Sequence, residues 1–209
     1  MRIAVIGTGH VGGALGLGWA QAGHDVIFGS RDPNDPEVRQ LVKGNKNASS
    51  AAIGEAGKGA EVIALALPWS AVPDVIKQMG TELRGKVLID CTNPAKQWPA
   101  MDHSAGSGGE QVAKLVPGTK VVKAFNTTGF ENMQNAKYPD GAVTMFYAGD
   151  DADAKKIVHQ LVRDLGFDPV DAGGLSQCHA LEILASLWGI LAYGQKMGRS
   201  IAFRLMRRW

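Results

Sequence analysis

The chain has 209 residues, of which 45% are hydrophobic and 20% charged, and its formal net charge is +2. This balance suits one α/β domain, or such a domain with a small appendage. It excludes the dense basic face typical of proteins that bind nucleic acid. The two cysteines, Cys91 and Cys178, lack CxxC spacing, so the sequence indicates neither a disulfide framework nor a metal cluster. We therefore expect a cytoplasmic protein.

No segment is predicted to span a membrane. Residues 3–6 form a short apolar run that is followed at once by glycines, unlike a signal peptide. The best candidate for a span, residues 181–194, is interrupted by Glu182. It also falls short of the roughly 18 apolar residues that a span needs.

The first part of the chain alternates short apolar runs with helical patterns, which predicts βαβ units around a parallel sheet. The expected strands are residues 2–7, 25–30, 61–68, 86–94 and 120–126. The expected helices are residues 11–23, 35–44, 70–80 and 107–118. The fold class is therefore α/β, a doubly wound Rossmann-type parallel sheet with a small C-terminal helical extension.

Two segments of the first part have no clear periodicity. Residues 47–60 are small and polar and predict a turn with a short helix, and residues 93–109 contain prolines and glycines and predict a long surface loop. The remaining expected elements are a strand at 143–149, a helix at 151–166, a strand at 168–173 and a helix from about Ser176 toward the C-terminus.

A glycine motif follows the first predicted strand. Its residues Gly7, Thr8, Gly9, His10, Val11 and Gly12 match GxGxxG. Between a strand and a helix this motif is typical of dinucleotide binding. The first glycine permits the tight turn, the second lets the backbone approach a pyrophosphate, and the third lets helix and strand pack closely. The helix N-terminus offers N–H groups to the phosphates, and His10 either adds a cationic donor or is tolerated in an exposed loop.

The end of the second predicted strand selects the dinucleotide. NAD sites place an acidic residue there, about 20 residues beyond the motif, to hold the ribose 2′-hydroxyl. Ser30 and Arg31 occupy that place here, and Asp32 comes one residue later. The guanidinium of Arg31 can pair with a 2′-phosphate, and the hydroxyls of Ser30 and Thr8 add donors. The sequence favours NADP(H), and we define an NADP-binding domain at residues 1–127 and a sheet extension with C-terminal helices covering the cleft at 128–209.

Ligands of a doubly wound sheet bind beyond the carboxyl ends of its strands. Three predicted strand ends supply further cofactor-binding candidates, namely Leu67, Pro68 and Trp69, then Asn93 and Pro94, then Ala124 and Asn126. The asparagines can hydrogen-bond a carboxamide or a ribose, and the prolines stiffen the loops. Each segment is also common turn material, so the prediction depends on three corresponding ends rather than on one.

No catalytic constellation is recognisable, because GxSxG, HExxH and CxxC are all absent. His24 and His159 are expected to be structural, and His103 and His179 are scattered along the sequence. Lys123 lies in a predicted strand and would be an acid only if it faced the cleft. We name no catalytic residue and no metal ligand. Hydride transfer between two cofactors needs mainly proximity and orientation.

Five segments occur in an order that resembles a known family. They are GTGHVGGALG at the N-terminus, GSR at 29–31, ALPW at 66–69, KAFNT at 123–127, and the AGDD…DAGGLS run. Together they are similar to the NADP oxidoreductases that depend on coenzyme F420, a deazaflavin, over essentially the whole chain. The resemblance implies hydride transfer between nicotinamide C4 and deazaflavin C5. It also implies NADP contacts from Thr8 to Val11 and at Ser30 and Arg31, Trp69 packed nearby, and a homodimer formed with the C-terminal region.

The resemblance has one departure. Archaeal deazaflavin-using members carry a histidine near the position of Asn126, and the KAFNT segment looks more like a bacterial branch and the oxidoreductase domain of transmembrane ferric reductases. We therefore predict an NADPH-dependent oxidoreductase that passes hydride to a small-molecule deazaflavin or flavin-like acceptor. The alternatives are an NADPH-dependent flavin or ferric reductase and a non-catalytic module that senses NADP(H). An imine or keto-acid reductase would need a larger helical domain after the last strands.

The C-terminal segment carries arginines interleaved with apolar residues, at positions 199, 204, 207 and 208. We interpret it as a helix end whose arginines favour the helix dipole. Contact with an acidic partner or a membrane surface is the alternative.

Overall fold

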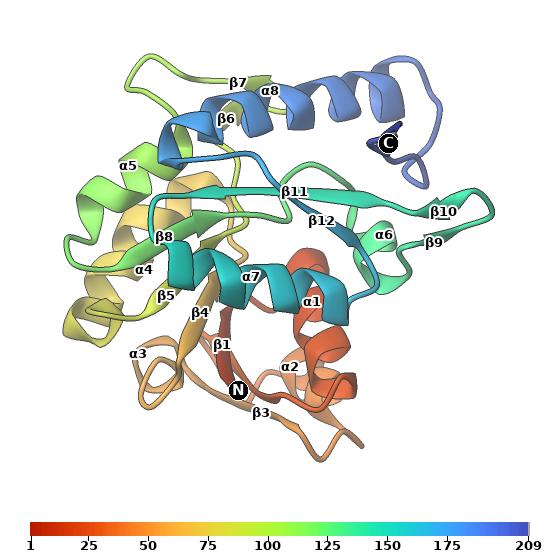
Figure 1. Ribbon diagram of the computed structural model, residues 1–209. Coiled ribbons are helices and arrows are strands. Elements are labelled where there is room, and N and C mark those ends of the chain that lie inside the picture. The colour runs from red at the N-terminus through yellow and green to blue at the C-terminus, as the bar shows by residue number, and fades with distance from the viewer. Residues whose placement is uncertain (209) are drawn as a thin grey trace.

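The computed structural model describes residues 1–208, which form one eight-stranded sheet flanked by helices (Figure 1). The strand order is β12-β11-β8-β5-β4-β1-β2-β3. The strands are β1 (Arg2–Ile6), β2 (Asp25–Ser30), β3 (Ala48–Ala52), β4 (Val62–Leu65), β5 (Val87–Asp90), β8 (Lys120–Lys123), β11 (Thr144–Gly149) and β12 (Asp168–Asp171). From β3 to β8 all neighbours are parallel.

The order of these six strands is that of the dinucleotide-binding fold. Strands β2 and β3 are added on one side of β1, and β4, β5 and β8 are added on its other side. Strands β1 and β4 are neighbours although β2 and β3 come between them in sequence. Their carboxyl ends therefore form the switch point where such folds hold ligands. Strand β11 then joins β8 in the antiparallel direction and β12 pairs with β11 in parallel, so the sheet is mostly parallel, as predicted.

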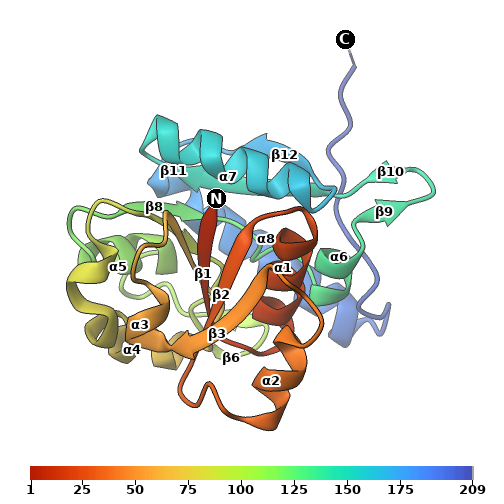
Figure 2. The same cartoon turned by 90° about the horizontal axis from the view of Figure 1, so that it is seen from below.

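Helices cover both faces of the sheet (Figure 2). The helices are α1 (His10–Gln21), α2 (Pro36–Val42), α3 (Ile53–Ala56), α4 (Val72–Met79), α5 (Gly108–Leu115), α6 (Phe130–Gln134), α7 (Ala152–Asp164) and α8 (Cys178–Gly189). The alternation of β1 shows how the two cores arise. Ile3 and Val5 pack with α1 and α7 on one face, whereas Ala4 and Ile6 pack with α3, α4 and α5 on the other. Residue period two along a strand thus divides the apolar residues between two layers.

Several local expectations were wrong. Residues 48–52 form the edge strand β3, because the backbone of β2 offers a parallel partner that outweighs the low strand propensity of alanine and serine. The predicted loop 93–109 contains a small hairpin, β6 (Ala95–Gln97) and β7 (Ala100–Met101). Helix α6 and the hairpin β9 (Lys137–Tyr138) and β10 (Gly141–Ala142) were missed.

The C-terminal segment, residues 195–208, contains neither helix nor strand, which corrects the interpretation of its arginines as a helix end. It runs past the start of β11, where the N–H of Thr144 donates to the carbonyl of Phe203. The side chains of Trp188 and Asn132 donate to the carbonyl of Ile201. The hydroxyl of Tyr138 donates to the carbonyl of Ser200.

The helical run Leu175–Gly194, which contains α8, is long and apolar enough to cross a membrane by length and composition alone. The expectation that this stretch is too short for a span was therefore wrong. In the fold its buried residues include Leu181, Glu182 and Trp188, and the helix lies across one end of the sheet (Figure 1). Core helices of globular proteins can have the same length and composition.

Candidate functional site

The loop between β1 and α1 is shaped by glycines that no other residue could replace without movement. Gly7 has a φ of +113°, and a Cβ there would lie 2.2 Å from the carbonyl oxygen of Ala66. A Cβ on Gly12 would lie 1.9 Å from the carbonyl oxygen of Gly7. A Cβ on Gly9 would meet nothing within 4 Å. Gly7 and Gly12 therefore close the turn, and Gly9 leaves an open surface beside the backbone, as a phosphate requires.

Helix α1 begins beside this open surface. Gly9 is its N-cap and no side chain caps its first turn. The first N–H groups of a helix lack intrahelical acceptors and carry the positive end of its dipole. An anion at Gly9 would therefore find backbone donors in place.

The end of β2 presents a free guanidinium. Arg31 is exposed and makes no ion pair or hydrogen bond with any residue from 1 to 208. The hydroxyl of Ser30 donates to the carbonyl of Asp32 and accepts the N–H of that residue. The carboxylate of Asp32 in turn accepts the N–H of Asn34. The carboxylate of Asp32 is thus hydrogen-bonded within the turn, and it does not pair with Arg31.

Two adjoining cavities lie beyond the carboxyl ends of β1, β4, β5 and β8. The inner cavity has a volume of about 340 Å³ and is lined by Gly9, His10 and Val11 of the phosphate loop together with strand-end residues. The outer cavity has a volume of about 360 Å³. The two share the lining residues Val11, Leu67, Pro68, Cys91, Phe130 and Arg199. They therefore form one continuous cleft that starts at the phosphate loop.

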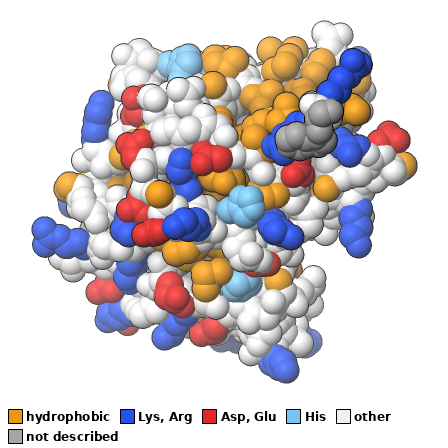
Figure 3. Space-filling model, in the orientation of Figure 1, with side chains coloured by type: hydrophobic (Ala, Val, Ile, Leu, Met, Phe, Trp, Pro, Cys, Tyr) orange, Lys and Arg blue, Asp and Glu red, His pale blue; other side chains and the backbone are white. Residues whose placement is uncertain are grey.

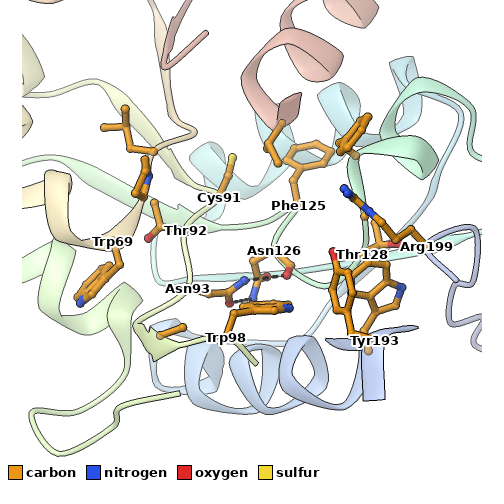
Figure 4. A pocket seen from close by; sticks show the side chains of 17 residues that line it. Trp69, Cys91, Thr92, Asn93, Trp98, Phe125, Asn126, Thr128, Tyr193 and Arg199 are labelled. Carbon is orange, nitrogen blue, oxygen red and sulfur yellow. Dashed lines mark hydrogen bonds between the residues drawn. The ribbon is translucent and has the colours of Figure 1, made fainter. Parts of the chain in front are cut away.

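The back wall of the outer cavity is a pair of asparagines (Figure 4). The side-chain amide of Asn93 donates to the carbonyl of Asn126, and the amide of Asn126 donates to Oδ1 of Asn93 and to the carbonyl of Leu181. Oδ1 of Asn126 is buried without a partner among residues 1–208. Phe125, which also lines the cavity, has a φ of +62°. Such strain and such an orphaned acceptor are both typical of ligand sites.

The outer wall is aromatic and comes from distant segments (Figure 4). Its residues are Trp69 after β4, Trp98 of the β6–β7 hairpin, Trp188 of α8, Tyr193 beyond α8, and Arg199 of the C-terminal segment. A Cβ on Gly189 would lie 3.0 Å from the ring of Trp98, so the glycine lets the hairpin pack directly on α8. Flat apolar walls of this kind suit a planar ring.

A buried charge network lies behind this wall. Nζ of Lys123 lies 2.7 Å from Oδ2 of Asp90 and 3.0 Å from Oε1 of Glu182, and all three side chains are fully buried. Burial opposes the charge of the lysine, but the two carboxylates outweigh it and raise its pKa. Nζ also donates to the carbonyl of Thr92, a cavity residue. Lys123 therefore anchors the cleft wall and does not face the cleft as an acid.

The network continues into the segment between β7 and α5 and into the first turn of α5. Nε2 of His103 lies 2.8 Å from Oε2 of Glu182, and the N–H groups of Gly108 and Gly109 donate to the same carboxylate. The ring of His103 lies 4.1 Å from that of His179, so two histidines that are scattered in sequence meet in space. Glu182 thereby fastens α8 to both the sheet and the loop.

The other histidines and Cys91 have structural surroundings. His24 pairs with Asp164 at 2.8 Å and His159 contacts the hydroxyl of Tyr147 at 3.1 Å, as expected of structural histidines. Cys91 lines both cavities, but burial raises the pKa of its thiol. A protonated thiol is a weak nucleophile, so Cys91 is a wall residue.

The structure brings most of the predicted site residues together. The cavity-lining members are Gly9, His10, Val11, Leu67, Pro68, Trp69, Asn93 and Asn126. Thr8, Ser30 and Arg31 lie on the loops that flank the phosphate end. Two residues lie behind the wall instead, because Ala124 is fully buried in the core and Pro94 packs against Gly108.

Sequence reasoning missed the lining residues Trp98, Phe130, Trp188, Tyr193 and Arg199. The sequence offered only their aromatic or basic character as a signal, because no motif surrounds them.

Known proteins resemble this chain in sequence. The model of the family described as NADP oxidoreductase, coenzyme F420-dependent, matches residues 2–94. The F420-dependent NADP reductase of Methanothermobacter marburgensis is 31% identical, over 90% of both chains. The chain belongs to the family of F420-dependent NADP oxidoreductases. Family membership places it among the NADP-dependent oxidoreductases.

Two further proteins are similar to this chain. A solved protein from Arthrobacter sp. FB24, whose proposed identity is F420-dependent NADP reductase, is 30% identical, with a TM-score of 0.89 over 99% of this chain and 100% of its own. The metalloreductase STEAP3 of Rattus norvegicus is 28% identical over 88% of this chain. This chain spans only 36% of the length of STEAP3.

Proposed function

We propose that this protein binds NADPH along the cleft and passes its hydride to a planar deazaflavin or flavin-like acceptor. The observation that carries the proposal is the continuity of the cleft, in which the cavity at the phosphate loop shares six lining residues with the aromatic cavity. A dinucleotide anchored at Gly9 would reach the outer cavity with its nicotinamide end. A flat acceptor on the aromatic wall would then lie beside it.

The choice of NADP(H) over NAD(H) rests on Arg31. Its guanidinium is unpaired within residues 1–208 and stands at the end of β2, where the ribose of an adenine dinucleotide lies in this fold. The nearest carboxylate in sequence, Asp32, is used by the turn. A planar fork of donors without a competing acidic residue suits a 2′-phosphate.

The nicotinamide end fits the asparagine pair. Oδ1 of Asn126 is a buried acceptor that lacks a donor within residues 1–208, and a carboxamide N–H would supply one. An unpaired buried acceptor costs about 1–3 kcal/mol, so its satisfaction would favour the bound ring. The site thus holds and orients the ring through side chains that do not ionise.

The chemistry requires little from the protein beyond this placement. NADPH, when bound, supplies the hydride from C4 of its nicotinamide. Trp69, Trp98 and Trp188 would flank the two rings and restrict their orientation. Among the lining residues no free general acid stands at the back wall, which is consistent with a transfer of hydride alone.

The deciding experiment mixes the purified protein with NADPH and oxidised F420 and follows the deazaflavin absorbance band. We expect rapid bleaching that requires the protein and is much slower with NADH. A second set of reactions replaces F420 by FMN or by a ferric chelate. Absence of NADPH oxidation with every acceptor, while NADP⁺ still binds, would contradict an enzymatic role and favour a sensor of NADP(H).

A flavin or a ferric chelate is the second candidate acceptor. It is supported by the similarity to STEAP3 over 88% of this chain and by asparagine rather than histidine at position 126. Faster NADPH oxidation with FMN or a ferric chelate than with F420 would favour this candidate.

We also propose that two copies pair through α8. Ile183, Leu187 and Ile190 are 50%, 44% and 45% exposed and follow one helical stripe. Figure 3 shows an apolar area on the part of the surface where α8 and the C-terminal segment lie. Exposed apolar patches of this kind mark interaction sites. Light scattering should give twice the mass of one chain, and Leu187→Glu should give the mass of one chain.

A further inference from the structure

The residues from 1 to 208 contain three buried side-chain polar atoms without a hydrogen-bond partner, and all three are at the cleft. They are Oδ1 of Asn126, Oε2 of Glu131 and Nε of Arg199. Asn126 and Arg199 line the outer cavity, and Glu131 contacts Arg199. Native proteins satisfy the great majority of such atoms. Their concentration at one place indicates partners that a ligand would supply.

The pair of Glu131 and Arg199 is poorly matched for a structural ion pair. Nε of Arg199 lies 2.9 Å from Oε1 of Glu131, yet the contact lacks hydrogen-bond geometry. The terminal nitrogens of Arg199 donate no hydrogen bond to any residue from 1 to 208. The strongest arginine–carboxylate pairs are bidentate, with two parallel bonds. Here most of the donor capacity of the guanidinium is unused.

The guanidinium is nevertheless held in position. Its Cζ lies 4.5 Å from the centre of the Phe130 ring, and the same ring stacks on His10 of the phosphate loop at 4.6 Å. The two residues after Arg199 are tied by their carbonyls to Tyr138, Asn132 and Trp188. Arg199 lines both cavities. It is therefore a prepositioned cation at the point where the inner and outer cavities join.

We propose that Arg199 is a ligand-binding residue which takes an oxyanion of the molecule in the cleft in exchange for Glu131. Two sources supply such an oxyanion, the pyrophosphate of the dinucleotide and a phosphate on the acceptor. Glu131 keeps the guanidinium charge compensated while the cleft is empty, and the incoming oxyanion takes the free terminal nitrogens. The inference rests on the proposed function, because it assumes a phosphate-bearing ligand in this cleft.

The exchange distinguishes this role from a structural one. In a structural pair, removal of either partner weakens the fold and affects every ligand alike. In the exchange, Arg199→Gln removes the ligand contact, whereas Glu131→Gln removes the competitor and strengthens binding of the same ligand. The variants of the two partners should therefore change affinity in opposite directions.

The experiment measures dissociation constants by quenching of tryptophan fluorescence, with NADP⁺, with FMN, and with riboflavin, which lacks the phosphate. The flavins are added to protein saturated with NADP⁺. We expect Arg199→Gln to weaken one phosphate-bearing ligand about 10- to 100-fold, Arg199→Lys to weaken it less, and Glu131→Gln to tighten it several-fold. Arg204→Gln is the matched control, because Arg204 lies on the same segment and is not a lining residue of the two cavities.

The pattern of losses identifies the source of the oxyanion. Weaker binding of NADP⁺ in Arg199→Gln identifies the pyrophosphate as the source. Weaker binding of FMN with unchanged binding of riboflavin identifies a phosphate on the acceptor. The inference would be overturned if Arg199→Gln left all affinities unchanged, or if it weakened FMN and riboflavin equally without weakening NADP⁺. Weaker ligand binding in Glu131→Gln would also overturn it. Thermal melting of each variant checks that the fold is intact. Failure of the proposed function has a different signature, because unmodified protein would then bind no NADP⁺.

Discussion

The phosphate side of the cleft is built from residues 7–31, a single stretch that follows β1 through α1 to the end of β2. The outer wall draws on four separate segments, represented by Trp69, Trp98, Trp188 and Arg199. The first region is fixed by backbone geometry within one βαβ unit. The second exists only when α8, the hairpin and the C-terminal segment have all packed. One side of the cleft is thus local, and the other is a product of tertiary structure.

The largest expected effect breaks the local side alone. In Gly9→Val the new side chain enters open space in the free protein and occupies the position of a phosphate. We expect loss of NADP⁺ binding by more than about 100-fold, with a melting temperature close to that of the unmodified chain. Titration calorimetry and thermal melting measure the two quantities.

Gly12→Ala is the contrasting control, because its Cβ would lie 1.9 Å from the carbonyl oxygen of Gly7. It should lower the melting temperature as well as binding. Normal affinity in Gly9→Val would show that the phosphates lie elsewhere.

The next effect breaks the foundation of the outer wall. Lys123→Met leaves the carboxylates of Asp90 and Glu182 buried without their cation. Removal of one partner from a buried pair costs about 3–5 kcal/mol, measurable as a lower denaturant midpoint. Lys58→Met removes an exposed pair with Glu55 and should leave the midpoint unchanged. Equal midpoints for both variants would mean that the buried network contributes nothing to stability.

The same network predicts a pH dependence of stability. The two carboxylates hold the pKa of Lys123 above its value of 10.5 in an unfolded chain. Folding therefore favours the protonated lysine, and its contribution is fully present below pH 10.5 and is lost as the pH rises above that value. Urea midpoints measured from pH 8 to pH 11.5 should fall at the alkaline end. In Lys123→Met this component of the alkaline decrease should be absent.

A smaller effect sharpens the chemistry of the local side. Arg31→Ala should weaken NADPH by about 10- to 100-fold, the equivalent of about 1.5–3 kcal/mol for a lost charge-assisted contact, and should leave NADH almost unchanged. Steady-state KM values with both dinucleotides test this. Equal losses for the two would show that Arg31 does not contact the 2′-phosphate.

The smallest effect concerns Cys91, which both cavities share. Burial raises the pKa of its thiol, so we expect slow alkylation by iodoacetamide at pH 8 in the folded protein and rapid alkylation in urea. Mass spectrometry of the peptide that contains Cys91 measures both rates. Fast labelling of the folded protein would mean that the cleft wall at Cys91 opens readily.

The phosphate side, residues 7–31, can be predicted from the sequence because neighbouring residues determine its backbone conformation. The turn at Gly7, the helix that starts at His10 and the position of Arg31 all follow from residue types at fixed spacing. Strand β3 escaped prediction because Ala48–Ala52 has no apolar alternation, and only the free edge of β2 makes it a strand. Arg199 escaped because its position depends on an irregular segment whose contacts come from α6, α8 and β9.

The tether of the C-terminal segment has a practical consequence for following this protein in solution. Side-chain bonds to the carbonyls of Ser200 and Ile201 hold the segment together with bonds at Thr144. These few bonds can open without unfolding the sheet. Such an irregular segment is a natural first target of trypsin, which would cut after Lys196, Arg199 or Arg204. A ligand that engages Arg199 would slow the cut after that residue. Limited digestion, read by the mass of the fragments, is therefore an assay of occupancy without a chromophore or a turnover assay.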